Sequence, residues 1–189
     1  MAEISEIDIL RERVAELESE TRKRTQIEKE LQYRLSFEEL ITNISSTFIN
    51  LPPARIDAAI TDALKQLGEF TQVDRSYIFR YNNCGLTMDN THEWCAPGIE
   101  SHIHRLKAIP LGNVSWLTRQ INAAQVVHIP HVADLPDEAA RLRKENIRQG
   151  TQSLIMVPTE FGGAVIGFLG LDSVRQQKTW PPDAIALLR

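Results

Sequence analysis

The sequence predicts an α+β protein in which a long charged helix precedes a globular domain of helices and antiparallel strand pairs. Residues 1–36 contain neither glycine nor proline and are rich in Glu, Arg and Lys, as expected of one uninterrupted helix. Residues 75–81 and 153–172 are instead rich in β-forming residues and are followed or divided by turn residues. These observations place helical and antiparallel elements in one chain.

An apolar seam predicts that residues 1–36 form a coiled-coil helix that acts as a linker. Apolar residues recur at alternating spacings of three and four, as at the a and d positions of a heptad, and charged residues fill most other positions. These residues are Ile7, Leu10, Val14 and Leu17. The pattern predicts a partner helix, most simply the same helix of a second copy, and therefore a homodimer.

The seam changes phase near the middle of this helix. The first register continues onto the polar residues Thr21, Arg24 and Glu28, whereas Ile27, Leu31 and Leu35 belong to a shifted register. Such a shift is typical of a stutter and predicts a weak, adjustable coupling. The alternative is a single solvated helix held by pairs four residues apart. The expected pairs are Glu18 with Arg22, Glu20 with Arg24, and Glu30 with Arg34.

Residues 37–189 are predicted to form a helical pair, a hairpin, an irregular stretch, a second hairpin and a last helix. Helices cover 37–50 and 56–67, with a Pro52-Pro53 break between them. Strands are expected at 75–81, 86–94, 126–129, 153–160 and 164–172. Short helices are expected near 99–106 and 115–121, and a charged one at 137–147. The last helix begins at Pro181-Pro182 and still has an apolar pattern at Arg189, as if it were truncated there.

Composition disfavours several kinds of partner. The net charge is −4, and basic residues alternate with acidic ones instead of forming a patch, so nucleic acid is not an expected ligand. The apolar runs 153–157 and 164–171 are too short to cross a bilayer, so no membrane segment is expected within this fragment. Cys84 and Cys95 form no CxxC motif, which favours free thiols in a reducing compartment and hence a cytoplasmic protein.

The order of these elements resembles the GAF domain family over residues 37–189. The motifs that carry the resemblance are RSYIFRY, SLIMVPTEFGGAVIGFLGLDSV and TWPPDAIALLR. The segments THEWCAPGI and GFLGLDSVR are similar to GAF modules of bacterial two-component sensor kinases and diguanylate cyclases. The resemblance implies an antiparallel sheet of five to six strands with helices on both sides, and a ligand cavity covered by the irregular stretch.

The same resemblance implies a regulatory sensory module of a multidomain two-component signalling protein, either a sensor histidine kinase or a response regulator. Such a module binds a small molecule or mediates dimerisation, and coiled-coil helices pass the signal on. The alternatives are a module of a diguanylate cyclase and a free-standing GAF-type methionine sulfoxide reductase. No nucleophile elbow, phosphate-binding loop, HExxH motif or carboxylate pair occurs, so we expect no turnover by this fragment.

Six residues are candidates for the wall of the ligand cavity, because they combine apolar surface with a few polar groups. They are Trp94, Cys95, His102, Trp116, His128 and Asp172. The alternative is that the two tryptophans are packed in the core and the histidines are ordinary surface residues. Neither His102-x-His104 nor His128-x-x-His131 has the spacing of a known metal motif, so no metal site is expected.

The sequence leaves the cofactor unknown. Family members that carry a linear tetrapyrrole attach it through a lid cysteine next to a histidine, whereas Cys95 precedes the lid and Ala96 follows it. We therefore expect no covalent bilin. Relatives that bind cyclic nucleotides carry an Asn-Lys, Phe, Asp-Glu set, whereas this sequence has Asp172-Ser173, Trp180 and Asp183-Ala184. This difference disfavours a cyclic nucleotide.

Overall fold

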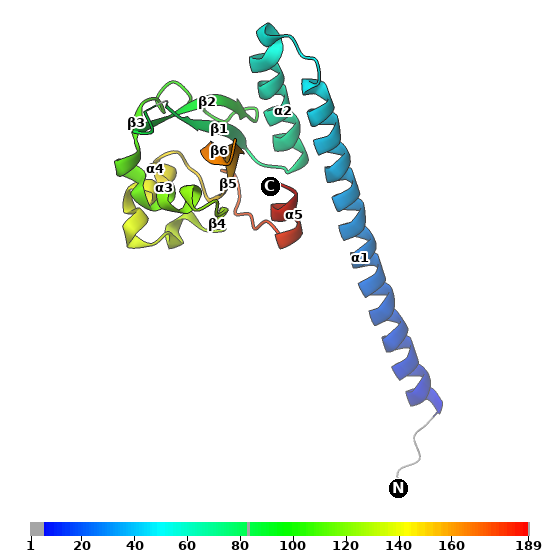
Figure 1. Cartoon of the computed structure of the whole chain (residues 1–189). Helices are drawn as coiled ribbons and strands as arrows, with labels where there is room; N and C mark the ends of the chain where they lie inside the picture. Colours follow the sequence, from blue (N-terminus) through cyan, green and yellow to red (C-terminus); the bar gives the residue numbers. More distant parts are fainter. Residues whose placement is uncertain (1–5, 83, 189) are drawn as a thin grey trace. The chain divides into compact units, whose positions relative to one another are not determined.

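The computed structural model describes residues 6–82 and 84–188 (Figure 1). The chain divides into two units, Met1–Glu39 and Leu40–Arg189, and each is described by itself. Helix α1, Glu6–Phe48, contains most of the first unit and continues into the second. The predicted continuation of the helical pattern from residues 1–36 into 37–50 is thus confirmed, and the single helix ends at Phe48.

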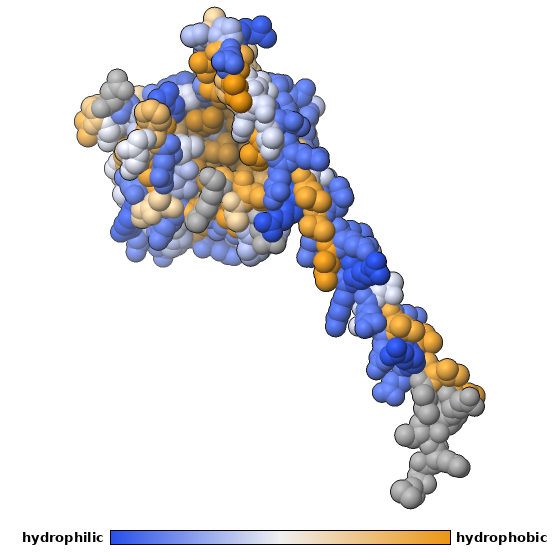
Figure 2. Space-filling view, turned by 45° about the vertical axis from the view of Figure 1, so that its right-hand side comes forward, coloured by the Kyte–Doolittle hydropathy of each residue, from blue (hydrophilic) through white to orange (hydrophobic). Residues whose placement is uncertain are grey.

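The apolar residues of α1 are exposed. Figure 2 shows separate hydrophobic patches along this helix, with hydrophilic surface between them. The exposed fractions are 59% for Ile7, 59% for Leu10, 54% for Val14 and 46% for Leu17. Ile27, Leu31 and Leu35 of the second register are exposed as well. Both sets are thus available to a partner helix.

Charged pairs run along α1, although not all in the expected combinations. Arg22 lies 4.0 Å from Glu18, as predicted. Arg24 and Arg34 instead donate hydrogen bonds toward the C-terminus, to Glu28 and Glu38. The phase break therefore has its own intrahelical contacts, which stabilise the isolated helix only weakly because they are solvent-exposed.

The second unit contains a six-stranded sheet with the strand order β3-β2-β1-β6-β5-β4, in which all neighbouring strands are antiparallel. The strands are β1 Arg75–Tyr81, β2 Thr87–Cys95, β3 Ile109–Pro110, β4 Val127–Ile129, β5 Ser153–Phe161 and β6 Ala164–Ser173. This arrangement confirms the predicted α+β class and the five- to six-stranded antiparallel sheet. The two predicted hairpins meet in the centre, where β1 pairs with β6.

Helices cover both faces of this sheet (Figure 1). Helix α2, Ile56–Phe70, lies on one face, where the Ser76 hydroxyl donates a 2.7 Å hydrogen bond to the Leu64 carbonyl. Helices α3, Ser115–Asn122, and α4, Ala140–Arg148, lie on the opposite face. The remaining helices are α5 Pro182–Leu187 and the short 3-10 helices η1 Pro53–Arg55, η2 Leu111–Val114, η3 Val132–Asp134 and η4 Asp137–Ala139.

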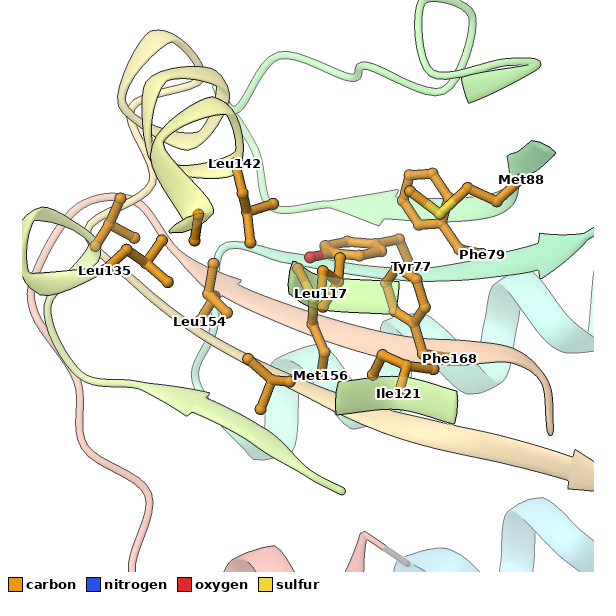
Figure 3. Close-up of a cluster of buried hydrophobic side chains, with 13 residues drawn as sticks. Tyr77, Phe79, Met88, Leu117, Ile121, Leu135, Leu142, Leu154, Met156 and Phe168 are labelled. Atoms are coloured by element: carbon orange, nitrogen blue, oxygen red, sulfur yellow. The ribbon is translucent and has the colours of Figure 1, made fainter. Parts of the chain in front are cut away.

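The main hydrophobic core lies between the sheet and α3 and α4. Figure 3 shows Tyr77, Phe79, Phe168 and Met156 of the strands in one cluster with Leu117 of α3. The rings of Phe79 and Phe168 stack with centroids 5.0 Å apart. This core positions the helices that cover the ligand cavity described below.

A β-bulge changes the side-chain alternation of β2. The pairing with β1 shifts between Ile78 and Phe79, so that Ile78 pairs with His92 and Phe79 with Asn90, leaving Thr91 as the extra residue. Because a bulge adds one residue to one strand, Asn90 and Glu93 face the same side of the sheet. The Asn90 amide confirms this by donating a 3.1 Å hydrogen bond to Glu93 Oε1.

The irregular stretch differs from its predicted structure at residues 99–106, which form turns instead of a helix. The backbone amides of His102 and Ile103 donate to Glu93 Oε2 at 2.8 and 3.1 Å. The Leu106 carbonyl accepts a hydrogen bond from the Asn90 amide. The segment is thus held by β2 through tertiary hydrogen bonds, which local periodicity does not reveal.

Candidate ligand cavity

A cavity of about 500 Å³ lies between the sheet and the segment that carries α3 and α4. Its apolar wall comes from the strands and from α3, through residues that include Phe79, Met88, Leu117, Met156 and Phe168. Its polar lining comes from the start of β1, from β2, from the segment between β2 and α3, from α4 and from the end of β6. The volume lies within the range of about 300–1,000 Å³ that is usual for small-molecule sites. This cavity is the candidate functional site.

Arg75, Tyr77 and Asp172 form a buried polar network at one end of the cavity. Arg75 Nη1 donates to Asp172 Oδ2 at 3.2 Å, and the Tyr77 hydroxyl donates to Asp172 Oδ1 at 2.9 Å. Thr151 donates a further hydrogen bond to Asp172 Oδ2 at 3.2 Å. The side chains of Arg75 and Asp172 are each 2% exposed. These contacts fix the guanidinium and the carboxyl group rigidly in the cavity wall.

Burial decides the ionisation of this network. Removal from water raises the pKa of Asp172 from 3.8 to about 6, although Arg75, Tyr77 and Thr151 act in the opposite direction. Burial also raises the pKa of Tyr77 well above its ordinary value, and the nearby Asp172 raises it further. Tyr77 is therefore a phenol that donates a hydrogen bond. Burial lowers the pKa of Arg75, but Asp172 and other neighbours outweigh this effect, so the group stays cationic.

Glu93 connects β2 to the loop that borders the cavity. Its side chain is 1% exposed and lies 3.9 Å from Arg75 Nε. Its Oε2 accepts hydrogen bonds from the Ser101 hydroxyl at 2.5 Å and from two backbone amides, those of His102 and Ile103. One carboxylate thus holds the loop and, together with Asp172, balances the charge of Arg75.

Basic residues of α4, together with Arg105 of the loop between β2 and β3, form the solvent-exposed side of the cavity. Arg105 lies 3.3 Å from Glu100, and Arg148 lies 2.5 Å from Glu145, so each has an acidic partner. Arg141 and Lys144 also line the cavity. Among the side chains of residues 6–82 and 84–188, neither of these two has a hydrogen-bond or ion-pair partner, although their backbones belong to helix α4. The cavity is therefore apolar inside, holds one cation between two carboxylates at its buried end, and is basic at its exposed side.

Comparison with known proteins identifies the family. A family model described as the GAF domain matches residues 55–189 of this chain. The chain belongs to the GAF domain family. The match begins within the residues for which the sequence motifs had already indicated this family, and it confirms that resemblance.

The GAF domain is similar to part of a known signalling protein. It is 30% identical over 139 residues to the methanogenesis regulatory histidine kinase FilI of Methanothrix harundinacea (strain 6Ac). The alignment covers 71% of this chain but only 15% of the relative, so this chain corresponds to a small part of that protein. The relative supports a signalling context for the domain.

Solved structures confirm the fold. The far-red absorbing dark state of JSC1_58120g3 with bound biliverdin IXa has a TM-score of 0.65 and 13% identity, over 80% of this chain and 90% of that one. The phycocyanobilin-bound GAF domain from a cyanobacterial phytochrome has a TM-score of 0.65 and 15% identity, over 80% and 86% of the two chains. At such identities the similarity concerns the fold alone.

Of the six predicted cavity residues, only Asp172 lines the cavity of this GAF domain. Trp94 lies opposite Ser76 in the β1–β2 pairing and packs under α2, where a Cβ atom on Gly68 would lie 2.3 Å from its ring. It therefore belongs to the other face of the sheet. Cys95 lies at the end of β2, with its Sγ 3.8 Å from the Glu100 carbonyl oxygen.

The other three predicted residues are also placed outside the cavity lining. His102 is buried in the loop held by Glu93, and burial lowers its pKa, as do Arg75 and Arg105. Trp116 is half-buried against the main core. His128 lies edge-on to Trp180, with ring centroids 5.7 Å apart, and burial lowers its pKa. The predicted tryptophans and histidines thus pack outside the cavity, whose aromatic wall comes instead from Tyr77, Phe79 and Phe168.

Several cavity residues were not predicted from the sequence. The alternation in RSYIFRY places Arg75, Tyr77 and Phe79 on one face, and a charged residue on an otherwise apolar strand face was the available signal. On α4, Arg141, Lys144 and Arg148 recur at spacings of three and four, which is the other signal that could have been used.

Residues 6–82 and 84–188 contain no group of at least three His, Cys, Asp or Glu side chains that could hold a metal ion. Over the same residues, no helix is both long and apolar enough to cross a membrane.

Proposed function

We propose that this GAF domain is the sensory module of a multidomain signalling protein of the histidine kinase type and that it binds a small molecule without turning it over. The observation that carries the proposal is the cavity of about 500 Å³ with an apolar wall and a rigid Arg75–Asp172–Tyr77 network. The histidine kinase relative supports this context over the cyclase alternative. Signal output would then come from a domain outside residues 1–189.

The proposed ligand is bound without a covalent bond. The solved structures similar in fold carry biliverdin or phycocyanobilin, as their descriptions state. Among the described residues, however, the cavity lining includes neither Cys84 nor Cys95, so a thioether link has no attachment point in it. Burial raises the pKa of the Cys95 thiol to about 11, which also disfavours the sulfoxide reductase alternative, because the thiolate is the nucleophile. Two free thiols favour a reducing compartment, in line with a cytoplasmic protein.

Native mass spectrometry of the protein purified from its natural host tests ligand binding. We expect an added mass that is released on denaturation and is lost in an Ile109→Trp variant, since Ile109 lines the cavity. Ile147→Trp is the matched control, because Ile147 is 58% exposed and lies outside the lining. A protein without added mass, or the same mass in the Ile109→Trp variant, would contradict the proposal.

We further propose that the exposed seam of α1 pairs with the same helix of a second copy. Four apolar side chains at a and d positions remain exposed in the single chain, and a two-stranded coiled coil would bury them. Val14→Asp should convert the dimer to a monomer in light scattering, whereas Ala15→Asp, at the neighbouring b position, should leave it dimeric. A monomeric wild-type protein, or a Val14→Asp variant that stays dimeric, would overturn this proposal.

A further inference from the structure

The cavity has positive charge without an acidic partner at one side only. Five basic and three acidic residues line it. Three of the basic residues have acidic partners. Arg148 pairs with Glu145, and Arg105 lies beside Glu100. Arg75 lies beside both Asp172 and Glu93. Two cations, Arg141 and Lys144, are left without an acidic partner in the described part of the chain. They lie three residues apart on α4, so both project from the same side of the helix.

The buried end of the cavity is a poor site for an anion. Arg75 is in contact with two carboxylates, so a third negative group would be repelled by Asp172 and Glu93. The wall between the two ends is apolar and includes Phe79, Met88 and Phe168. A ligand that fills this space must therefore combine an apolar body with a negative group near α4.

From this distribution we infer that the ligand is an amphipathic organic anion. Its apolar body lies between the sheet and α3, and its acidic group binds Arg141 and Lys144. The inference rests on the proposed function, because it specifies the chemistry of the same cavity. It adds the class of ligand and the two residues that select it, and it requires no bond to be formed or broken.

Two fluorescent probes of matched shape test the inference. Anilinonaphthalene sulfonate and phenylnaphthylamine share a naphthalene and a phenylamine group, but only the former carries an anionic sulfonate. We expect the Arg141→Gln/Lys144→Gln variant to lose about tenfold in affinity for the sulfonate, the size of two partly exposed charge contacts. Its affinity for the uncharged probe should not change. Added salt should weaken binding of the sulfonate to the wild-type protein but not to the double variant.

The control variant removes the same charge elsewhere. Lys65 and Arg119 are exposed basic residues outside the cavity lining, so Lys65→Gln/Arg119→Gln should leave both affinities unchanged. Equal losses in both double variants would overturn the inference, since they would reflect net charge alone. Equal affinity changes for the two probes, or none for the sulfonate, would overturn it too.

The result also separates this inference from the proposed function. If the uncharged probe binds to the wild-type protein but not to the Ile109→Trp variant, the cavity is a ligand site whatever the outcome for the sulfonate. If neither probe binds, or if the Ile109→Trp substitution lowers the affinity for neither, the cavity does not take up amphipathic molecules and both proposals fail. Circular dichroism and melting curves of every variant show whether its fold is retained.

Discussion

The ring of Tyr77 lies directly against the backbone of Gly170, where a Cβ atom would lie 2.1 Å from Tyr77 Cε2. The two residues are paired across β1 and β6, and the missing side chain allows the phenol to lie flat and to reach Asp172. Glycine is thus required at this position for close approach, as is common where another group packs against a strand.

Gly170→Ala should therefore destabilise the protein. The added methyl group forces the Tyr77 ring to move, at a cost of about 1–3 kcal/mol, which is typical of overpacking. Urea unfolding measures this change. Gly112→Ala is the matched control, because a Cβ atom there meets nothing within 4 Å, and its effect should be much smaller. Equal effects of both substitutions would contradict the role of close packing.

Asp172 should make stability depend on pH in mildly acidic solution. Burial raises its pKa in the folded protein from 3.8 to about 6, so the folded state holds this proton more tightly than the unfolded chain. The stabilisation is complete below the unfolded pKa and is lost as the pH rises through about 6. Relative to Asp172→Asn, the wild-type protein should therefore lose stability between pH 4 and 6 in denaturant titrations. A constant difference over this window would contradict the raised pKa.

Glu93→Gln should loosen the loop that borders the cavity. The amide group of Gln retains only one acceptor oxygen, whereas Glu93 accepts hydrogen bonds at both of its oxygens. The loss of a charged acceptor for buried amides costs about 1–3 kcal/mol. Hydrogen exchange of the His102 and Ile103 amides should accelerate. Glu100→Gln, which changes an exposed side chain, should leave their exchange unchanged.

Trp94→Ala should affect stability but not ligand binding. Its ring packs against α2 on the sheet face opposite the cavity, so its removal creates a cavity under the helix, at a cost of about 3 kcal/mol. Thermal or urea unfolding measures this loss, and the phenylnaphthylamine affinity of the folded variant should equal that of the wild type. A selective loss of probe affinity would return Trp94 to the candidate ligand site.

Helix phase should matter for signalling if α1 couples the GAF domain to an output domain. Two registers of similar free energy let a ligand select between two packings through its differential affinity. In the full-length protein, an insertion of seven residues near position 22 restores the heptad and should preserve regulation of output. An insertion of two residues rotates the helix by about 200° and should invert or abolish regulation. Unchanged regulation with both insertions would make α1 a passive tether.

Local sequence patterns predicted most of the elements and their order, but they missed strand β3 and wrongly assigned a helix to residues 99–106. Turn residues between β-rich segments predicted the two central hairpins, and an uninterrupted charged pattern predicted a long helix, because these features depend on local backbone preferences. The motifs around these elements were sufficient for the GAF family. They also predicted Asp172, near the end of the last strand, as a cavity residue.

The residues that meet in the cavity are set by long-range strand pairing, which the local sequence does not show. Arg75 and Asp172 are 97 residues apart, and their contact depends on the pairing of β1 with β6. The bulge at Thr91 reverses the alternation of β2, so it decides that Glu93 faces the cavity and Trp94 faces α2. Periodicity reports that a strand is buried, but in a sheet covered on both faces it does not report which face holds the ligand. That choice is made by strand pairing and by the helices packed on each side, because these long-range contacts have no signal in the local sequence.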